Sequence, residues 1–231
     1  MIRLRPAAER GHADYGWLRT WHSFSFADYY DPAEMGWGPL RVINEDIVAP
    51  GQGFPMHGHR DMEIVTVILS GALEHRDSMG NGAVIRPGEV QYMRAGSGVR
   101  HSEFNPAADA PTHLLQIWIA PAAGGLVPGY EQSAPSPGAD GWTLVASPDG
   151  QRGSVRIRQD ASLLRADVAA GDVRRHALAA GRLAYVHLID GDLAVNGVVL
   201  ASGDGAKVAD ETALEFVARA DSRFLLFDLP G

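Results

Sequence analysis

The sequence predicts an all-β protein in which two jelly-roll-like β-barrel domains follow one another along the chain. Helical periodicity is rare, whereas short runs of β-branched and aromatic residues recur between clusters of Gly, Pro, Asn and Asp. Strands of about 4–8 residues separated by turn signals in this way are typical of barrels and sandwiches. A segment dense in Pro and Gly divides the chain near its middle and indicates two units of similar size.

The first unit contains five strand-like runs. In order, they read LRVINEDIV, EIVTVIL, ALEHRD, EVQYMRA and THLLQIWIA. Between the third and the fourth, the stretch DSMGNGAVIRPGE supplies two turns, at Gly80-Asn81-Gly82 and at Pro87-Gly88.

The composition changes at 121–141, PAAGGLVPGYEQSAPSPGADG, which is typical of a connecting segment. Strand-like runs then resume with WTLVAS, VRIRQD, LLRADV, LAYVHLIDG, DLAVNGVVL, LEFVA and RFLLFDLP. VTVILSGALEHRD (65–77) and AYVHLIDGDLAVNG (184–197) share an apolar strand, an X-Gly turn and a second strand, which predicts an internal repeat. We expect domains at 1–122 and 143–231, joined by a linker at 123–142.

Composition excludes several classes of partner and site. The 231 residues carry a formal net charge of −8, and Lys207 is the only lysine, so direct nucleic-acid binding is disfavoured. With no cysteine, a transition-metal site must use His, Asp and Glu. No apolar run reaches the ~18 residues of a membrane span, and the N-terminus lacks the apolar core of a signal peptide. We expect a cytoplasmic protein without a membrane segment.

Two pairs of metal-ligand residues stand at strand spacing. His57 and His59 flank Gly58, and about 40 residues later His101 and Glu103 repeat the i, i+2 pattern beside the glycine-rich turn GSG. Residues two apart on a strand point to the same face, so each pair can present two donors to one ion. Three imidazoles and one carboxylate suit Fe²⁺, Mn, Co, Ni, Cu or Zn and leave open positions for water, substrate or O₂.

These residues also carry a family resemblance. Gly51-x5-His57-x-His59-x3-Glu63 resembles the first cupin motif, although Gly71 comes one residue later than usual. Gly88-x5-Arg94-x-Gly96-x4-His101-x3-Asn105 resembles the second, with Arg94 where proline is common and a longer gap before His101. TWHSFSFADYYDP, VINEDIVAPGQGFPMHGHRDMEIVTVILSGALEHRDSMGN and MRAGSGVRHSEFNP resemble the pirin family, in particular its bacterial members assigned as quercetin 2,3-dioxygenases.

The resemblance implies a bicupin fold and a ligand set. The fourth ligand of pirins corresponds to Glu103, whereas that of many other cupins corresponds to Glu63, and both are present here. We expect His57, His59, His101 and Glu103 to bind one divalent ion, with Fe²⁺ first and Zn, Cu, Ni, Co or Mn also fitting. Glu63 is then expected nearby, either as a hydrogen-bonded strand carboxylate or, with Glu103, as a catalytic proton-handling group.

The resemblance further implies a metal-dependent dioxygenase that cleaves flavonols such as quercetin with O₂ and releases carbon monoxide. The rival interpretation is a redox-responsive iron protein that regulates a protein partner. An enzyme needs an apolar cavity reaching the metal, whereas a sensor needs a contiguous partner surface. We expect the chain to act as a monomer.

The remaining histidines and aromatic residues favour structural roles. His22 is expected to be a structural hydrogen-bonder, and His75 a surface group. If Gly191 corresponds to Gly71, the positions matching His57 and His59 are Ala177 and Ala179, so the second unit is expected to be a degenerate cupin without ligands, with His176 on the opposite strand face. The aromatic residues near the N-terminus are expected mostly to pack, with some able to cover a barrel mouth: Trp17, Trp21, Phe24, Phe26, Tyr29 and Tyr30.

Overall fold

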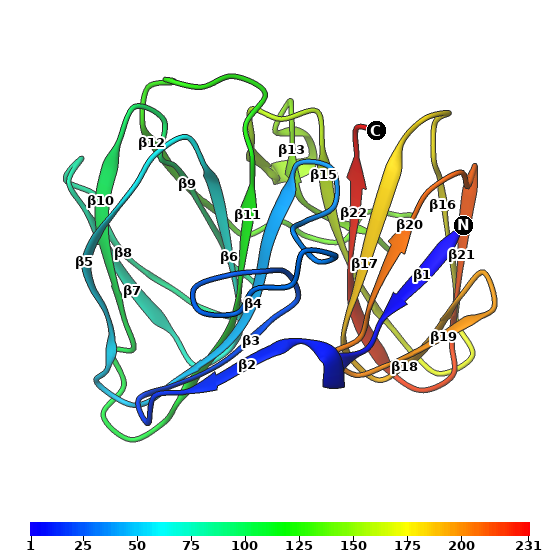
Figure 1. Cartoon of the computed structure of the whole chain (residues 1–231), viewed down its shortest axis with the longest axis horizontal. Coiled ribbons are helices and arrows are strands. Elements are labelled where there is room, and N and C mark those ends of the chain that lie inside the picture. Colours follow the sequence, from blue (N-terminus) through cyan, green and yellow to red (C-terminus); the bar gives the residue numbers. More distant parts are fainter.

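Two β-barrels lie side by side in the computed structural model, which describes residues 1–231 (Figure 1). The helical content is two three-residue 3₁₀ turns, η1 (Ala7–Glu9) and η2 (Gln151–Gly153). The prediction of an all-β chain with two tandem barrels is therefore confirmed. No helix is long and apolar enough to cross a membrane.

The first barrel packs a seven-stranded sheet, ordered β12-β9-β6-β11-β4-β3-β2, against a four-stranded sheet, ordered β5-β10-β7-β8. Its strands are β2 (Gly11–Asp14), β3 (Leu18–His22), β4 (Leu40–Val48), β5 (Gly53–His59), β6 (Glu63–Ser70), β7 (Leu73–Asp77), β8 (Gly82–Ile85), β9 (Val90–Arg94), β10 (Val99–Phe104), β11 (Thr112–Ile119) and β12 (Gly129–Ser133).

The second barrel repeats this plan, with sheets ordered β1-β20-β17-β22-β15-β13-β14 and β16-β21-β18-β19. Its strands are β1 (Ile2–Arg5), β13 (Thr143–Ser147), β14 (Val155–Arg156), β15 (Ser162–Val168), β16 (Val173–Ala177), β17 (Leu183–Asp190), β18 (Asp192–Val195), β19 (Val198–Ala201), β20 (Gly205–Val208), β21 (Ala213–Ala218) and β22 (Ser222–Leu229). The hairpins β6–β7 and β17–β18 occupy equivalent places, as the repeat predicts.

Two edge strands depart from the expected domain boundaries. β12 lies within the expected linker yet pairs with β9 of the first barrel, Tyr130 opposite Met93. β1 starts the chain yet pairs with β20 of the second barrel, Ile2 opposite Val208. Each occupies the same edge of its sheet, where it satisfies backbone groups that would otherwise be unpaired. The division at 1–122, 123–142 and 143–231 thus needs these two corrections.

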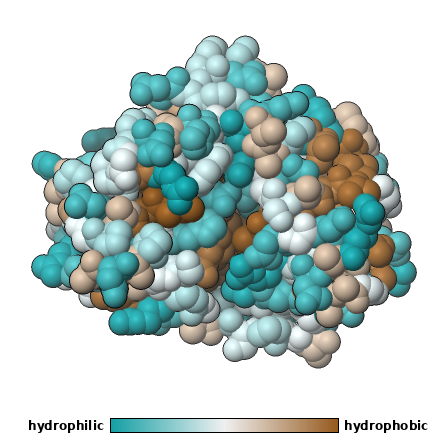
Figure 2. Space-filling view, turned by 90° about the horizontal axis from the view of Figure 1, so that it is seen from below, coloured by the Kyte–Doolittle hydropathy of each residue, from teal (hydrophilic) through white to brown (hydrophobic).

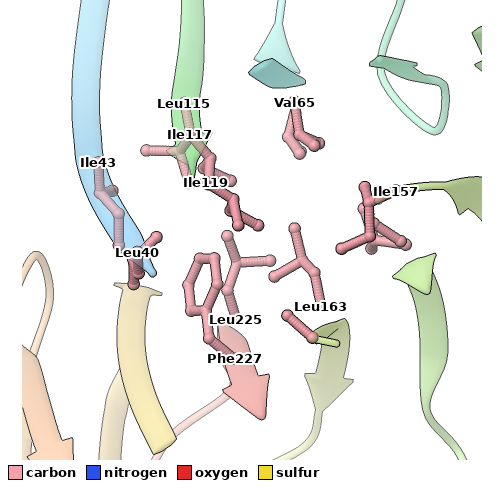
Figure 3. Close-up of a cluster of buried hydrophobic side chains, with 14 of the residues drawn as sticks. Leu40, Ile43, Val65, Leu115, Ile117, Ile119, Ile157, Leu163, Leu225 and Phe227 are labelled. Atoms are coloured by element: carbon pink, nitrogen blue, oxygen red, sulfur yellow. The ribbon is translucent and has the colours of Figure 1, made fainter. Parts of the chain in front are cut away.

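The two seven-stranded sheets face each other across a shared core. A cluster of 20 buried apolar residues draws on both barrels, and Figure 3 shows side chains of β4 and β11 pointing toward those of β15 and β22. A second cluster of 19 residues fills the interior of the second barrel. In the first barrel the interior clusters contain only six and four residues. The first barrel therefore keeps internal space that the second has filled.

Candidate metal centre

β5 and β10 position the predicted ligands by simple strand alternation. On β5, His57 and His59 are half-buried, whereas Gly58 between them and Met56 before them are exposed. On β10, His101 lies directly opposite His57, and an irregularity in the pairing separates it from Glu103. Both His101 and Glu103 are about 1% exposed, so their side chains face the barrel interior.

The structure brings the three histidines together. One ligand atom from each of His57, His59 and His101 lies within 4.8 Å of the others. The ring centroids are 4.4 Å apart for His57 and His101, 4.8 Å for His57 and His59, and 4.9 Å for His59 and His101. Such a group converges on one point that a single ion can occupy.

The imidazoles have the protonation that metal binding requires. His57 Nδ1 lies 2.8 Å from the Pro55 carbonyl oxygen, so Nδ1–H donates and Nε2 keeps a free lone pair. Burial lowers the pKa of His59 to about 4, with the neighbouring His57 acting in the same direction. Burial and the surrounding histidines also lower the pKa of His101 strongly. His59 and His101 are thus neutral near pH 7, the form in which an imidazole coordinates a cation.

Glu103 completes the donor set from the same strand as His101. Its Oε2 accepts a hydrogen bond of 2.8 Å from Gln116 Nε2. Burial raises the pKa of Glu103 to about 7, although the hydrogen bond from Gln116 acts to lower it. Its Oε1 and His101 Nε2 are both buried without a hydrogen-bond partner. Buried polar atoms normally have partners. A metal ion bound between them would supply the missing interaction, so these residues fit such an ion.

Glu63 is not brought to this cluster, which corrects the expectation that it lies nearby. It shares one face of β6 with Val65 and Val67, and that face packs in the core between the barrels. Its Oε1 accepts hydrogen bonds from the Tyr92 hydroxyl (2.6 Å) and the Arg158 backbone N–H (2.5 Å). Burial raises its pKa. Of its two expected roles, that of a hydrogen-bonded strand carboxylate agrees with this position.

His75 was expected at the surface, and the structure places it in the interior. Its side chain is 0% exposed, and its ring lies 5.3 Å from that of His101 and stacks on Tyr130 at 4.9 Å. It is close enough to His101 and Glu103 for the three to form a second group of ligand-type atoms. The run ALEHRD carries the signal in retrospect, because alternation places His75 on the same face as buried Leu73 and Asp77.

A pocket with a volume of about 370 Å³ opens onto the metal centre, lined by His57, His59 and Glu103 among others. Two edge-to-face aromatic pairs border it, Trp17 with Phe54 and Phe26 with Trp118. The opposite wall is polar and comes from three adjacent strands: Thr20, His22, Asn44, Asp46 and Gln116. Seen from below, the half of the molecule with the first barrel has a hollow with an apolar floor (Figure 2).

The other aromatic and histidine residues divide between lining and packing. Of the N-terminal aromatic set, Trp17 and Phe26 line the pocket, whereas Phe24 belongs to the core between the barrels. His22 is a structural hydrogen-bonder, as predicted, through Asn44 Oδ1 at 2.8 Å, and it also lines the pocket.

His176 lies on the opposite face of β16 from exposed Ala177, as expected, but that face is the interior one. It pairs with buried Leu214, so it faces the interior of the second barrel, where it contacts Asp228 at 2.8 Å. Both groups of three ligand-type residues lie in the first barrel.

Comparison with known proteins agrees with this geometry. Residues 3–119 match the family model described as Pirin, and residues 144–229 match that of the quercetinase C-terminal cupin domain. Quercetin 2,3-dioxygenase of Escherichia coli K12 is 48% identical over 100% of this chain and 99% of its own. A pirin-like protein of Caulobacter vibrioides is 42% identical over 99% of each.

Solved structures extend the likeness to the whole fold. The structure of bacterial pirin YhhW from Escherichia coli in complex with nickel(II) has a TM-score of 0.96 and 47% identity, covering 100% of this chain and 99% of that one. YhhW itself was also solved separately, again with a TM-score of 0.96 and 98% of its chain covered. The chain described here belongs to the pirin family.

Proposed function

We propose that this protein is a metal-dependent dioxygenase that cleaves flavonols such as quercetin with O₂ and releases carbon monoxide. The observation that carries the proposal is the aromatic pocket, which reaches His57, His59 and Glu103 directly. Full-length similarity to proteins named quercetin 2,3-dioxygenase supports the choice of substrate. A flat polyphenol fits between edge-to-face aromatic pairs, and its hydroxyls meet the polar wall.

The protein's own groups perform three tasks in this scheme. His57, His59, His101 and Glu103 would hold the ion, which when bound would lower the pKa of the substrate 3-hydroxyl. Glu103, where it binds the ion only loosely, would accept the proton of that hydroxyl through Oε1, while Gln116 holds Oε2 in place. Phe54 and Trp118 lie beside the histidines, with Trp118 4.9 Å from His59, and exclude water from the reacting carbons.

We propose Fe²⁺ as the resident ion, because a mixed set of imidazoles and one carboxylate with open positions is typical of non-haem iron. The same donors accept nickel, which is the ion bound in the YhhW complex. Reconstitution of the metal-free protein with each ion in turn, followed by turnover, tests this choice. Higher activity with another ion at equal occupancy would contradict it.

The rival regulatory function is less well supported. A regulatory protein requires a contiguous surface for its partner. The metal centre instead opens into a pocket with the size of a small molecule. We also propose a monomer, because the two barrels cover each other's large sheets through the shared core. Light scattering of the purified protein measures this directly.

The test of the function is aerobic turnover of quercetin, followed as loss of its near-visible absorbance together with carbon monoxide release. His57→Ala and Glu103→Gln should each lower kcat/KM by more than about 100-fold, because even outer partners of a metal site cost 10–100-fold. The matched controls are His12→Ala, an exposed histidine, and Glu63→Gln, a carboxylate outside the pocket. Both should retain metal and activity. A metal-loaded wild type that turns over no faster than His57→Ala would exclude quercetin as the substrate.

A further inference from the structure

A buried row of polar groups begins at His101 and contains His75 and Asp77, neither of which lines the pocket. Asp77 Oδ1 accepts hydrogen bonds from the backbone N–H groups of Met79 (2.9 Å) and Asn81 (3.0 Å). Asp77 Oδ2 accepts one from Asn81 Nδ2 (2.9 Å) and lies 3.2 Å from His75 Nε2. Three donors therefore fix the carboxylate independently of His75 and orient its remaining lone pair toward that ring.

These contacts determine the tautomer of His75. An ionised carboxylate can only accept, so His75 Nε2 must carry the proton that it donates to Asp77. The neutral ring then has its lone pair on Nδ1. That atom lies 2.9 Å from Gln91 Nε2, which donates to it, and 3.4 Å from His101 Nδ1.

The tautomer of His101 follows from that of His75. The single lone pair of His75 Nδ1 accepts mainly from Gln91 Nε2 and faces His101 Nδ1 at the longer distance of 3.4 Å. A second lone pair on His101 Nδ1 would repel it, whereas an N–H there shares it, so the geometry favours the proton on His101 Nδ1. The lone pair of His101 is thereby placed on Nε2, the buried nitrogen that has no protein partner. Metal-binding histidines commonly donate their other N–H to an acceptor that orients the ring.

We propose that Asp77 and His75 are positioning residues that act in series, holding His101 in the tautomer whose Nε2 lone pair faces the metal. This inference rests on the proposed metal site and deepens it. His75 is itself no ligand of that site, since Asp77 and Gln91 already engage its two nitrogens. Its ring is further fixed by stacking on Tyr130 of β12, the edge strand contributed by the segment between the barrels.

Asp77→Asn tests the series with a nearly isosteric change. The carbonyl oxygen of the new amide side chain would keep the backbone donors of Met79 and Asn81. Its NH₂ group would then donate to His75 Nε2 and, once the Asn81 amide turns over, to Asn81 Oδ1. The proton of His75 would move to Nδ1, and His101 would have to accept there and carry its own proton on Nε2. The metal-binding lone pair would be lost without removal of any ligand.

The first readout is the tautomer itself, from ¹⁵N chemical shifts of the histidine rings in the metal-free protein. Wild type should show His101 protonated on Nδ1, and Asp77→Asn should show it protonated on Nε2. The second is Ni²⁺ affinity by competition with a chelator, which should fall by about 10–100-fold in Asp77→Asn and in His75→Phe. His75→Phe retains an aromatic ring against Tyr130 and keeps the fold. Glu74→Gln, on the exposed face of the same strand, is the control and should change neither readout.

The outcomes separate this inference from the proposed function. A wild-type His101 protonated on Nε2, or both variants binding Ni²⁺ with wild-type affinity, would overturn the positioning role even if the enzyme turns over quercetin. Wild type that binds Ni²⁺ but cleaves no flavonol would overturn the function and leave the positioning role standing. The wild-type spectrum decides the tautomer even if Asp77→Asn fails to fold.

Discussion

Asp46 gives the pocket a buried carboxyl group besides Glu103. It lines the polar wall, and its side chain is 3% exposed. Burial raises its pKa from about 3.8 to about 7, with the negative charge of Glu45 acting in the same direction and the Thr20 hydroxyl opposing it. Near neutral pH this carboxyl group is thus partly protonated and can donate as well as accept a hydrogen bond at the polar end of a bound ligand.

The shift in Asp46 predicts a pH dependence of stability in the metal-free protein. Between about pH 4 and pH 7 the folded state holds a proton that the unfolded state has released, so the free energy of unfolding falls as pH rises. Asp46→Asn has no such proton. Relative to wild type it should therefore gain stability with rising pH, by up to about 1 kcal/mol per pH unit. Urea unfolding of both proteins from pH 4 to pH 7 measures this difference. If the free energy of unfolding changed with pH in the same way in both proteins, the raised pKa of Asp46 would be contradicted.

The ligand residues were predictable because their arrangement is local. His57 with His59, and His101 with Glu103, share a face through the two-residue period of a strand, which requires no knowledge of the rest of the fold. The position of Glu63 could not be predicted in this way. β5 and β6 belong to different sheets, and the chain reverses between them at Asp61, whose φ is +49°. His75 was missed because alternation shows only that it shares a face with Leu73, whereas its burial depends on Tyr130 and Gln91, which other strands supply.

At the scale of elements, β1 pairs with β20 beside a buried ion pair between Lys207 and Glu34, and Arg3 of β1 contacts the same Glu34 at 2.9 Å. Lys207 of β20 lies opposite Arg3 of β1, and its side chain is 2% exposed. Its Nζ lies 2.5 Å from Glu34 Oε2 and 5.4 Å from the centre of the Phe24 ring. Because Lys207 is the only lysine, its amine reports on this one junction alone.

Amine labelling of the native protein should therefore modify the exposed N-terminus and spare Lys207. Modification of Lys207 requires β1 and the segment around Glu34 to separate from β20, so its rate should be at least about 100-fold slower than in urea. Glu34→Gln removes the ion pair and should raise that rate without changing the reactivity of Met1. Mass spectrometry of peptides after timed labelling distinguishes the two sites. Equal rates at Lys207 and Met1 in the native protein would show that β1 is not held as described.

The pairings of β1 and β12 also mark the limit of prediction at this scale. Hairpins such as β6–β7 and β17–β18 could be expected from apolar runs around a glycine turn, because their partners are adjacent in sequence. β1 pairs with a strand about 200 residues away, at the edge of its sheet. Nothing local in either segment identifies the sheet it completes, so boundaries drawn from composition placed β1 in the first domain and β12 in the linker.

At the scale of the whole molecule, the two barrels share a core instead of merely touching. Val65 and Ile117 of the first barrel and Leu225 and Phe227 of the second all belong to one cluster of 20 buried apolar residues (Figure 3). The second barrel has filled its own interior and contributes a face that completes the first. The first barrel therefore depends on the second for the packing behind β4 and β11, two of the strands that line the pocket.

This arrangement predicts that the chain unfolds as one unit. Separation of the barrels would expose the shared core to water, at about 25 cal/mol per Å² of apolar surface. Leu225→Ala, a change in the second barrel far from the ligands, should lower the free energy of unfolding by about 2–5 kcal/mol. It should reduce amide-exchange protection in β6 and β11 as much as in β17 and β22. Calorimetry of the chelator-treated protein should show one transition, with equal calorimetric and van't Hoff enthalpies. Two transitions, or lost protection confined to the second barrel, would show that the barrels fold independently.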